Sequence, residues 1–135
     1  MIKTLCEKAK QARNCAYAPY SAFKVGAALL CGDGEIYTGC NIENASYSPT
    51  CCAERVAFFK AVSDGKREFS AIAVCGGKED TLSESPCFPC GVCRQVLREF
   101  CKDDFKIYVM SRDEVKEYSL SDILPFSFGV ENLEV

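Results

Sequence analysis

Three short segments of the sequence carry side chains that could do chemistry together. Residues 52–55 are C-A-E-R, residues 89–95 are P-C-G-V-C-R-Q, and residues 41–44 are N-I-E-N. Thiolates are strong ligands of Zn²⁺, and a carboxyl group beside a metal-activated water can transfer its protons. The first two segments therefore predict a metal centre for hydrolysis. The third supplies an amide and a carboxylate that could hold a diol.

The spacing of the cysteines predicts which thiols bind the metal. Cys90 and Cys93 would share one face of the first turn of a helix, and Pro89 suits the start of that helix. Helix N-termini lower the pKa of a nearby thiol through their oriented N–H groups. A second helix start at Cys52 would bring a third thiolate to the same zinc ion. Three protein ligands leave the fourth tetrahedral position for water, as in catalytic zinc sites.

The residues next to these cysteines suggest two further roles. Glu54 is too close to Cys52 in the chain for both to bind zinc comfortably, so we predict that Glu54 is the proton shuttle. Three thiolates outweigh the charge of Zn²⁺ and would weaken its Lewis acidity. We therefore expect Arg55 and Arg94, each next to a ligand, to contact the thiolates and offset their charge.

The cysteine count favours metal binding over disulfides. The chain has 11 cysteines, an odd number, and no histidine. Cysteines that are adjacent or two residues apart, without an export signal, indicate metal ligation or catalysis in a reducing compartment. Because imidazole is absent, a metal site must be built from thiolates and carboxylates.

Length and charge restrict the classes of function. A chain of 135 residues is the usual size of one domain, and we expect residues 1–135 to form a single one. The formal net charge of −3 argues against binding to nucleic acid or to an anionic membrane surface. No apolar run approaches the ~20 residues of a membrane helix, and the N-terminus lacks the apolar block of a signal peptide. We expect a cytoplasmic protein that acts on a small molecule.

Hydrophobic periodicity predicts the elements that must position these segments. Helices alternate with apolar strands through the middle of the chain, which favours an α/β fold: a three-layer α-β-α sandwich with a central five-stranded mixed sheet. The expected helices are 2–16, 53–63, one that starts near residue 90, and 121–124. The expected strands are 23–31, 35–41, 71–75, 105–110 and 116–120, with a hairpin turn at 32–34.

The motifs resemble those of one family over nearly the whole chain. A ligand-x-Glu segment followed by P-C-x-x-C is typical of zinc deaminases. Together with residues 16–21, 23–30, 39–44 and 124–125, it resembles the small homotetrameric cytidine deaminases. The resemblance implies one Zn²⁺ per subunit and hydrolytic deamination of cytidine and deoxycytidine to the uridines plus ammonia, a step of pyrimidine salvage. Zinc-bound hydroxide would attack carbon 4 of the base.

The resemblance also implies the residues that bind the nucleoside. Asn41 and Glu43 would bind the ribose hydroxyls, Phe23 would flank the nucleoside, and the backbone of Ala53 would contact the base. A C-terminal phenylalanine would reach a neighbouring subunit's site and stack on the pyrimidine. Phe128 is the match by its spacing from residues 124–125, and Phe126 is its competitor.

Several alternatives remain open at the level of the sequence. Cys87, Cys90 and Cys93 are spaced by three, which also suits a non-catalytic iron–sulfur cluster or a closed four-thiolate zinc site. Cys51 could replace Cys52 as ligand, although only Cys52 gives the C-A-E spacing. The enzyme could also act on another aminated nucleoside, such as an antibiotic, or on a base within nucleic acid, which the acidic composition disfavours.

Overall fold

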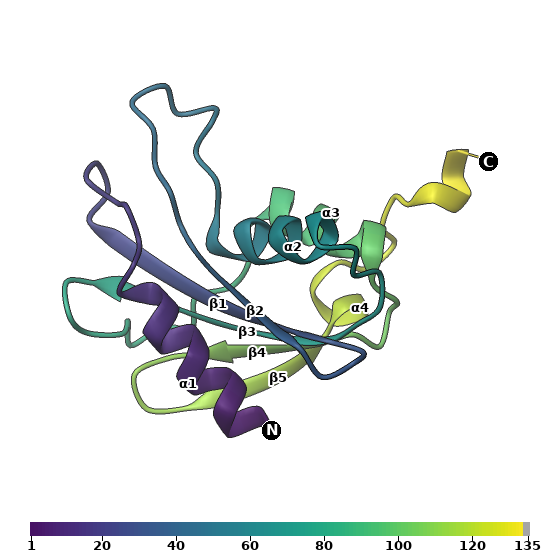
Figure 1. Ribbon diagram of the computed structural model, residues 1–135, viewed down its shortest axis with the longest axis horizontal. Helices are drawn as coiled ribbons and strands as arrows, with labels where there is room; N and C mark the ends of the chain where they lie inside the picture. The colour runs from purple at the N-terminus through teal and green to yellow at the C-terminus, as the bar shows by residue number, and fades with distance from the viewer. Residues whose placement is uncertain (134–135) are drawn as a thin grey trace.

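A five-stranded mixed sheet forms the centre of the molecule (Figure 1). The structure is a computed structural model that describes residues 1–133. The strand order is β2-β1-β3-β4-β5, in which β3 and β4 are parallel and all other neighbours are antiparallel. The strands are β1 (Phe23–Cys31), β2 (Ile36–Cys40), β3 (Phe69–Lys78), β4 (Lys106–Met110) and β5 (Val115–Ser119).

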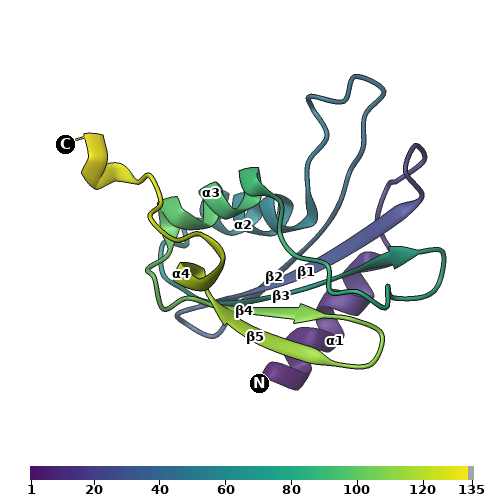
Figure 2. The ribbon, with the colours of Figure 1, turned by 180° about the vertical axis from the view of Figure 1, so that it is seen from behind.

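Helices cover both faces of this sheet (Figures 1 and 2). On one face, α1 (Ile2–Arg13) packs its apolar side over β1 and β3, with Leu5 fully buried. On the other face lie α2 (Ala53–Ser63) and α3 (Gly91–Phe100), and Phe58 is buried in the core beneath them. The short α4 (Leu120–Ile123) and a 3₁₀ turn (Val130–Leu133) follow β5. The predicted three-layer α-β-α sandwich is confirmed.

The order and type of the predicted elements match the structure, and two boundaries differ by three residues while the others differ by at most two. The first helix ends at Arg13 rather than near Ala16. The strand predicted at 71–75 extends to Lys78, because Gly76 and Gly77, which the sequence assigned to a loop, pair with β1. Among residues 1–133, none of the helices combines the length and the apolar character needed to span a bilayer.

The contact between β2 and α2 fixes where the first sequence motif lies. A side chain at Gly39 would collide with the backbone of Ala53 and Ala57, so only glycine allows this close approach. The chain between the two elements leaves as a long loop, which a backbone bridge between Ile42 and Cys51 closes. As a result, Cys52 stands at the end of that loop and directly before the first turn of α2.

A buried arginine joins α1 to the ends of β1 and β3. The side chain of Arg13 is 4% exposed. Its Nε donates to the carbonyl oxygen of Lys24 at 3.1 Å, and its Nη2 donates to those of Gly77, Glu79 and Thr81 at 2.8, 2.5 and 3.1 Å. A buried cation needs such partners, and the four carbonyl groups in turn depend on it.

Replacement of Arg13 by methionine is expected to lower the free energy of unfolding by about 2–4 kcal/mol, because buried carbonyl groups lose a charged donor. Urea unfolding followed by circular dichroism measures the change. Arg67→Met is the matched control, because Arg67 is exposed and also donates to backbone carbonyls. We expect the control to lie within about 0.5 kcal/mol of wild type. Equal destabilisation by both variants would contradict this role of Arg13.

Candidate active site

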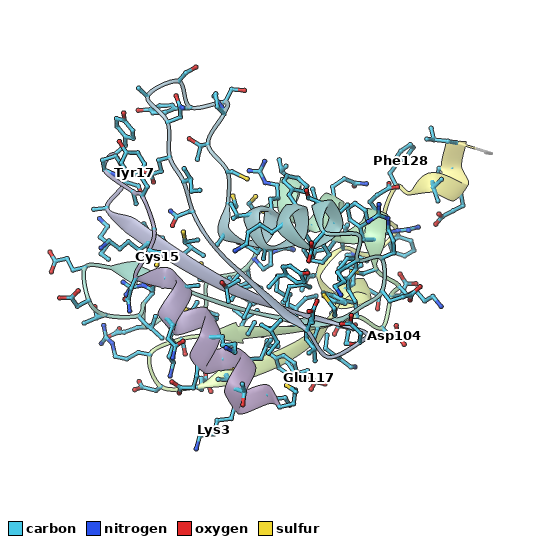
Figure 3. All side chains as sticks on the ribbon, in the orientation of Figure 1. Lys3, Cys15, Tyr17, Asp104, Glu117 and Phe128 are labelled. Carbon is cyan, nitrogen blue, oxygen red and sulfur yellow. The ribbon has the colours of Figure 1, made fainter. Side chains whose placement is uncertain are left out.

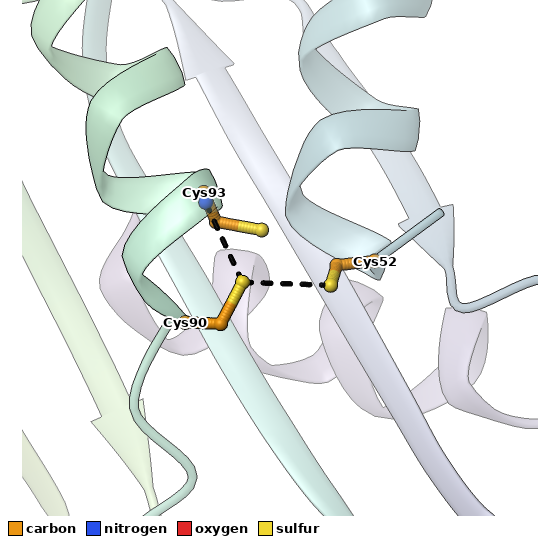
Figure 4. Close-up of side chains that lie close together, drawn as sticks. All are labelled: Cys52, Cys90 and Cys93. Carbon is orange, nitrogen blue, oxygen red and sulfur yellow. Dashed lines mark hydrogen bonds between the residues drawn. The ribbon is translucent and has the colours of Figure 1, made fainter. Parts of the chain in front are cut away.

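Three thiols meet where α2 and α3 begin (Figure 4). Cys52 is the N-cap of α2, Cys90 is the N-cap of α3, and Cys93 lies in the first turn of α3. Their sulfur atoms all lie within 4.8 Å of one another, and the Sγ atoms of Cys52 and Cys90 are 3.7 Å apart. The backbone N–H of Cys93 donates to the Sγ of Cys90 at 3.5 Å. Both caps are therefore thiols at the positive ends of helix dipoles.

The separation of the sulfurs suits one zinc ion. Zn–S bonds of about 2.3 Å in a tetrahedron place neighbouring sulfurs about 3.8 Å apart. The 3.7 Å between Cys52 and Cys90 matches that edge. Cys93 is buried, Cys52 is half-buried and Cys90 is exposed, so the cluster opens toward solvent on the side of Cys90. The residues present can hold a zinc ion with three thiolates.

The helix start at Cys90 differs in detail from the expectation. Proline was expected to begin the helix, but Pro89 lies before the N-cap, and the first helical residue is Gly91. Because of this shift Cys90 is the N-cap, and its sulfur accepts a hydrogen bond from the first turn of the helix. In most helices the side-chain oxygen of a Ser, Thr, Asp or Asn N-cap accepts this hydrogen bond.

Arg55 lies against the thiols. Its Nη2 donates to the Sγ of Cys52 at 3.4 Å and to the carbonyl oxygen of Thr50 at 3.4 Å. Within residues 1–133 its Nε is buried without a hydrogen-bond partner. Hydrogen bonds from the Cys93 thiol and then from Arg55 lower the pKa of Cys52, against the effect of burial. The same contact with Cys52, together with burial, raises the pKa of Cys93. The guanidinium of Arg55 therefore lies where it can offset the negative charge of a Cys52 thiolate.

Arg94 does not share this role. Its Nε donates to the carbonyl oxygen of Pro89 at 2.8 Å, its Nη1 donates to that of Ile123 at 2.6 Å, and its guanidinium lies 6.0 Å from the ring centre of Phe88. In the part of the chain that the structure describes, no hydrogen bond joins it to a thiol. The expected contact with the thiolates is therefore wrong for Arg94. The reason is that the carbonyl groups of Pro89 and Ile123 already hold its guanidinium.

Arg55→Ala is expected to weaken zinc binding by about 10- to 100-fold, because it removes the cation beside the thiolates. Competition with a chelator of known affinity measures the change. Arg67→Ala removes an exposed arginine of the same charge and serves as the control. Wild-type zinc affinity and full activity in Arg55→Ala would contradict the charge-offset role.

Glu54 is a buried carboxyl group directly beside the thiols. It lies in the first turn of α2 and is 4% exposed. Burial raises the pKa of Glu54 to about 7, and the negative charge of Cys52 adds to this effect, while its own backbone N–H and Arg55 act in the opposite direction. A carboxyl group with such a pKa can both hold and release a proton near neutral pH.

Cys87 and Cys51 lie outside the thiol cluster. Among the described residues, Cys52, Cys90 and Cys93 form the only group of three or more potential metal ligands within 4.8 Å of one another. A Cβ added at Gly76 would lie 2.8 Å from the Sγ of Cys87, and burial raises the pKa of this thiol to about 12. The backbone of Cys51 pairs with that of Ile42 in the bridge that closes the loop. The structure therefore supports three thiol ligands and not four.

Asn41 and Glu43 hold neighbouring backbone in place. The Oδ1 of Asn41 accepts from the N–H of Val25 at 2.8 Å, and its Nδ2 donates to the carbonyl oxygen of Phe23 at 2.8 Å. The carboxylate of Glu43 accepts from the N–H groups of Tyr20 and Ser21 and from the Ser21 hydroxyl, which keeps the pKa of Glu43 below its usual value. Sequence reasoning missed these contacts.

The other predicted substrate residues lie in three places. Ala53, fully buried, is the first residue of α2, and the ring of Phe23 lies against Gly76 on the same side as Cys87.

A hollow of ≈ 370 Å³ lies beside Glu43, lined by Tyr20, Ser21, Glu43, Asn44, Tyr47 and Thr50. The backbone of Tyr17 is hydrogen-bonded to that of Asn41 and Glu43. Phe128 is 57% exposed and Phe126 fully exposed, and Phe128 lies at the opposite end of the molecule from Tyr17 (Figure 3). The structure thus separates Phe128 from this group.

This arrangement defines a class of protein. An α-β-α sandwich in which two helix N-termini gather three thiols beside a buried glutamate is typical of the zinc-dependent deaminases. The family described as the cytidine and deoxycytidylate deaminase zinc-binding region matches residues 1–110. The chain belongs to this family.

Named relatives resemble the chain over nearly its whole length. The cytidine deaminase of Sporosarcina psychrophila is 51% identical over 133 residues, which are 98% of this chain and 94% of the relative. That of Halalkalibacterium halodurans is 49% identical over 130 residues, 96% of this chain and 95% of the relative. The crystal structure of cytidine deaminase from Burkholderia pseudomallei superposes with a TM-score of 0.88 at 46% identity, covering 95% of this chain and 99% of that one.

Proposed function

We propose that this chain is a zinc-dependent cytidine deaminase, which converts cytidine or deoxycytidine and water to the corresponding uridine and ammonia. The observation that carries the proposal is the group of three thiols within 4.8 Å of one another. The buried Glu54 lies beside this group, two residues after Cys52 in the chain. Membership of the deaminase family and relatives named cytidine deaminase support it.

Cys52, Cys90 and Cys93 would hold one Zn²⁺ per chain. When bound, zinc supplies a Lewis acid that makes water nucleophilic at neutral pH. Glu54 takes a proton from the attacking water and gives it to the ring nitrogen next to carbon 4 of the base. Glu54 then takes the second proton of that water and delivers it to the amino group, which leaves as ammonia. The water oxygen becomes the carbonyl oxygen of uridine, so atoms and protons balance.

The side chains of Asn41 and Glu43, near β1 and β2, have hydrogen-bonding capacity left for a sugar. After its two backbone contacts, the Asn41 side chain keeps one N–H and one carbonyl lone pair. The Glu43 carboxylate has lone pairs beyond its three contacts. These groups can bind the ribose hydroxyls, while the ring of Phe23 flanks the nucleoside and the backbone of Ala53 contacts the base.

The proposed enzyme is a homotetramer in which neighbouring subunits complete each site. Phe128 would stack on the pyrimidine of a neighbour, in preference to Phe126. Its exposure of 57% and its place far from its own chain's Tyr17 support a role in another subunit (Figure 3). Exposed apolar side chains on α2 and α3, among them Phe59 and Val92, support self-association. All 11 cysteines are free, which supports a reducing compartment such as the cytoplasm.

The test is conversion of cytidine by the purified chain with its zinc content measured. We expect the ultraviolet band of cytidine to disappear, uridine and ammonia to form in equal amounts, and deoxycytidine to react as well, with kcat/KM of at least about 10⁴ M⁻¹ s⁻¹. A polynucleotide containing cytosine should not react. Zinc-loaded protein that converts neither nucleoside would overturn the proposal.

A further inference from the structure

Polar side chains of α3 hold the C-terminal tail, residues 125–133, on both sides of Phe128. The Nε2 of Gln95 donates to the carbonyl oxygen of Phe128 at 2.9 Å. The Nε of Arg98 donates to the Ser127 hydroxyl at 2.8 Å, and its Nη2 forms an ion pair with Glu131. The backbone around Phe128 is therefore fixed, while its ring remains exposed.

Gly129 brings the tail directly onto the guanidinium of Arg98. A Cβ at this buried glycine would lie 2.5 Å from the Cζ of Arg98. The N–H of Gly129 donates to the Oδ1 of Asn132 at 2.8 Å, and the N–H of Asn132 donates to the carbonyl oxygen of Gly129 at 2.9 Å, which closes a turn over the arginine. With 17% of its side chain exposed, Arg98 is largely covered by the tail that it binds.

We propose that Arg98 is a positioning residue that presets Phe128 for the neighbouring subunit's nucleoside. This inference rests on the proposed function. A tail that is already ordered gives up little conformational freedom when Phe128 stacks on a base, whereas a loose tail would have to be ordered at the expense of affinity. The N-cap and first turn of α3 supply Cys90 and Cys93 to the metal site of their own chain, and Arg98 near the end of α3 anchors the tail that offers Phe128 to another.

Arg98→Ala is expected to raise the KM for cytidine about three- to tenfold, with kcat and zinc content within about twofold of wild type. Gly129→Ala should have the same effect, because its Cβ displaces the guanidinium without removing the charge. In a Phe128→Ala background, Arg98→Ala should change KM no further, since both changes remove the same contact.

The controls separate positioning from general structure. Lys102→Ala removes an exposed positive charge just beyond α3 and should leave KM unchanged. An unchanged KM in Arg98→Ala, or additive effects of Arg98→Ala and Phe128→Ala, would overturn the inference. If wild type fails to deaminate cytidine, the proposed function fails instead. Chymotrypsin then tests the anchoring alone: faster cleavage after Phe128 in Arg98→Ala supports it, and equal cleavage overturns it.

Discussion

The Glu54→Gln variant is expected to lose at least about a thousandfold in kcat for cytidine while it folds and binds zinc as wild type does. Glutamine fills the same volume at this 4% exposed position, but its amide cannot accept and return a proton. Because the thiols and Arg55 are untouched, the effect is confined to proton transfer. The measurements are kcat, zinc per chain and the far-ultraviolet circular dichroism spectrum.

Glu99→Gln provides the matched control for this result. Glu99 also lies on a helix of the same layer, but its side chain is exposed. We expect its kcat to stay within about twofold of wild type. A Glu54→Gln variant that retained most of its activity would show that the proton shuttle lies elsewhere.

Cys90→Ala is expected to abolish both zinc binding and deamination. The change removes one of three sulfurs from the cluster, and two thiolates cannot retain the ion against a chelator. It also removes the cap that accepts from the N–H of Cys93, which costs about 0.5–2 kcal/mol of stability. The chain should therefore remain folded at room temperature but hold no zinc after dialysis.

Cys87→Ala is the control that distinguishes an open site from a closed one. Cys87 is also a cysteine three residues before Cys90, yet its sulfur lies against Gly76 and outside the cluster. We expect one zinc per chain in this variant under the same dialysis. Loss of zinc from Cys87→Ala would indicate a four-thiolate structural site instead.

The sequence predicted the layers of the fold because its apolar patterns are strong and local. The helix and strand order followed from periodicity, and the two helix starts followed from the cysteine motifs. The end of β3 was missed because Gly76 and Gly77 have no side chains that signal a strand. Their pairing with β1 is a long-range contact that local patterns do not contain.

Helix spacing alone does not separate the two arginines, because Arg94 is four residues after Cys90 and residues four apart also share a helix face. Arg55 is three residues after Cys52, and residues three apart share a helix face, so it reaches the thiol. Arg94 directly follows Cys93 and points away, to the backbone of Pro89 and Ile123. The contacts of Asn41 and Glu43 likewise had no local signal, because their partners are backbone groups of residues 20–25.

X-ray absorption spectroscopy at the zinc edge of the purified protein tests most directly whether the three thiols form an open catalytic centre. We expect three sulfur ligands at about 2.3 Å and one oxygen ligand at about 2.0 Å, the pattern of a site with a position left for water. Four sulfur ligands would contradict an open site and would indicate that Cys87 completes a structural one.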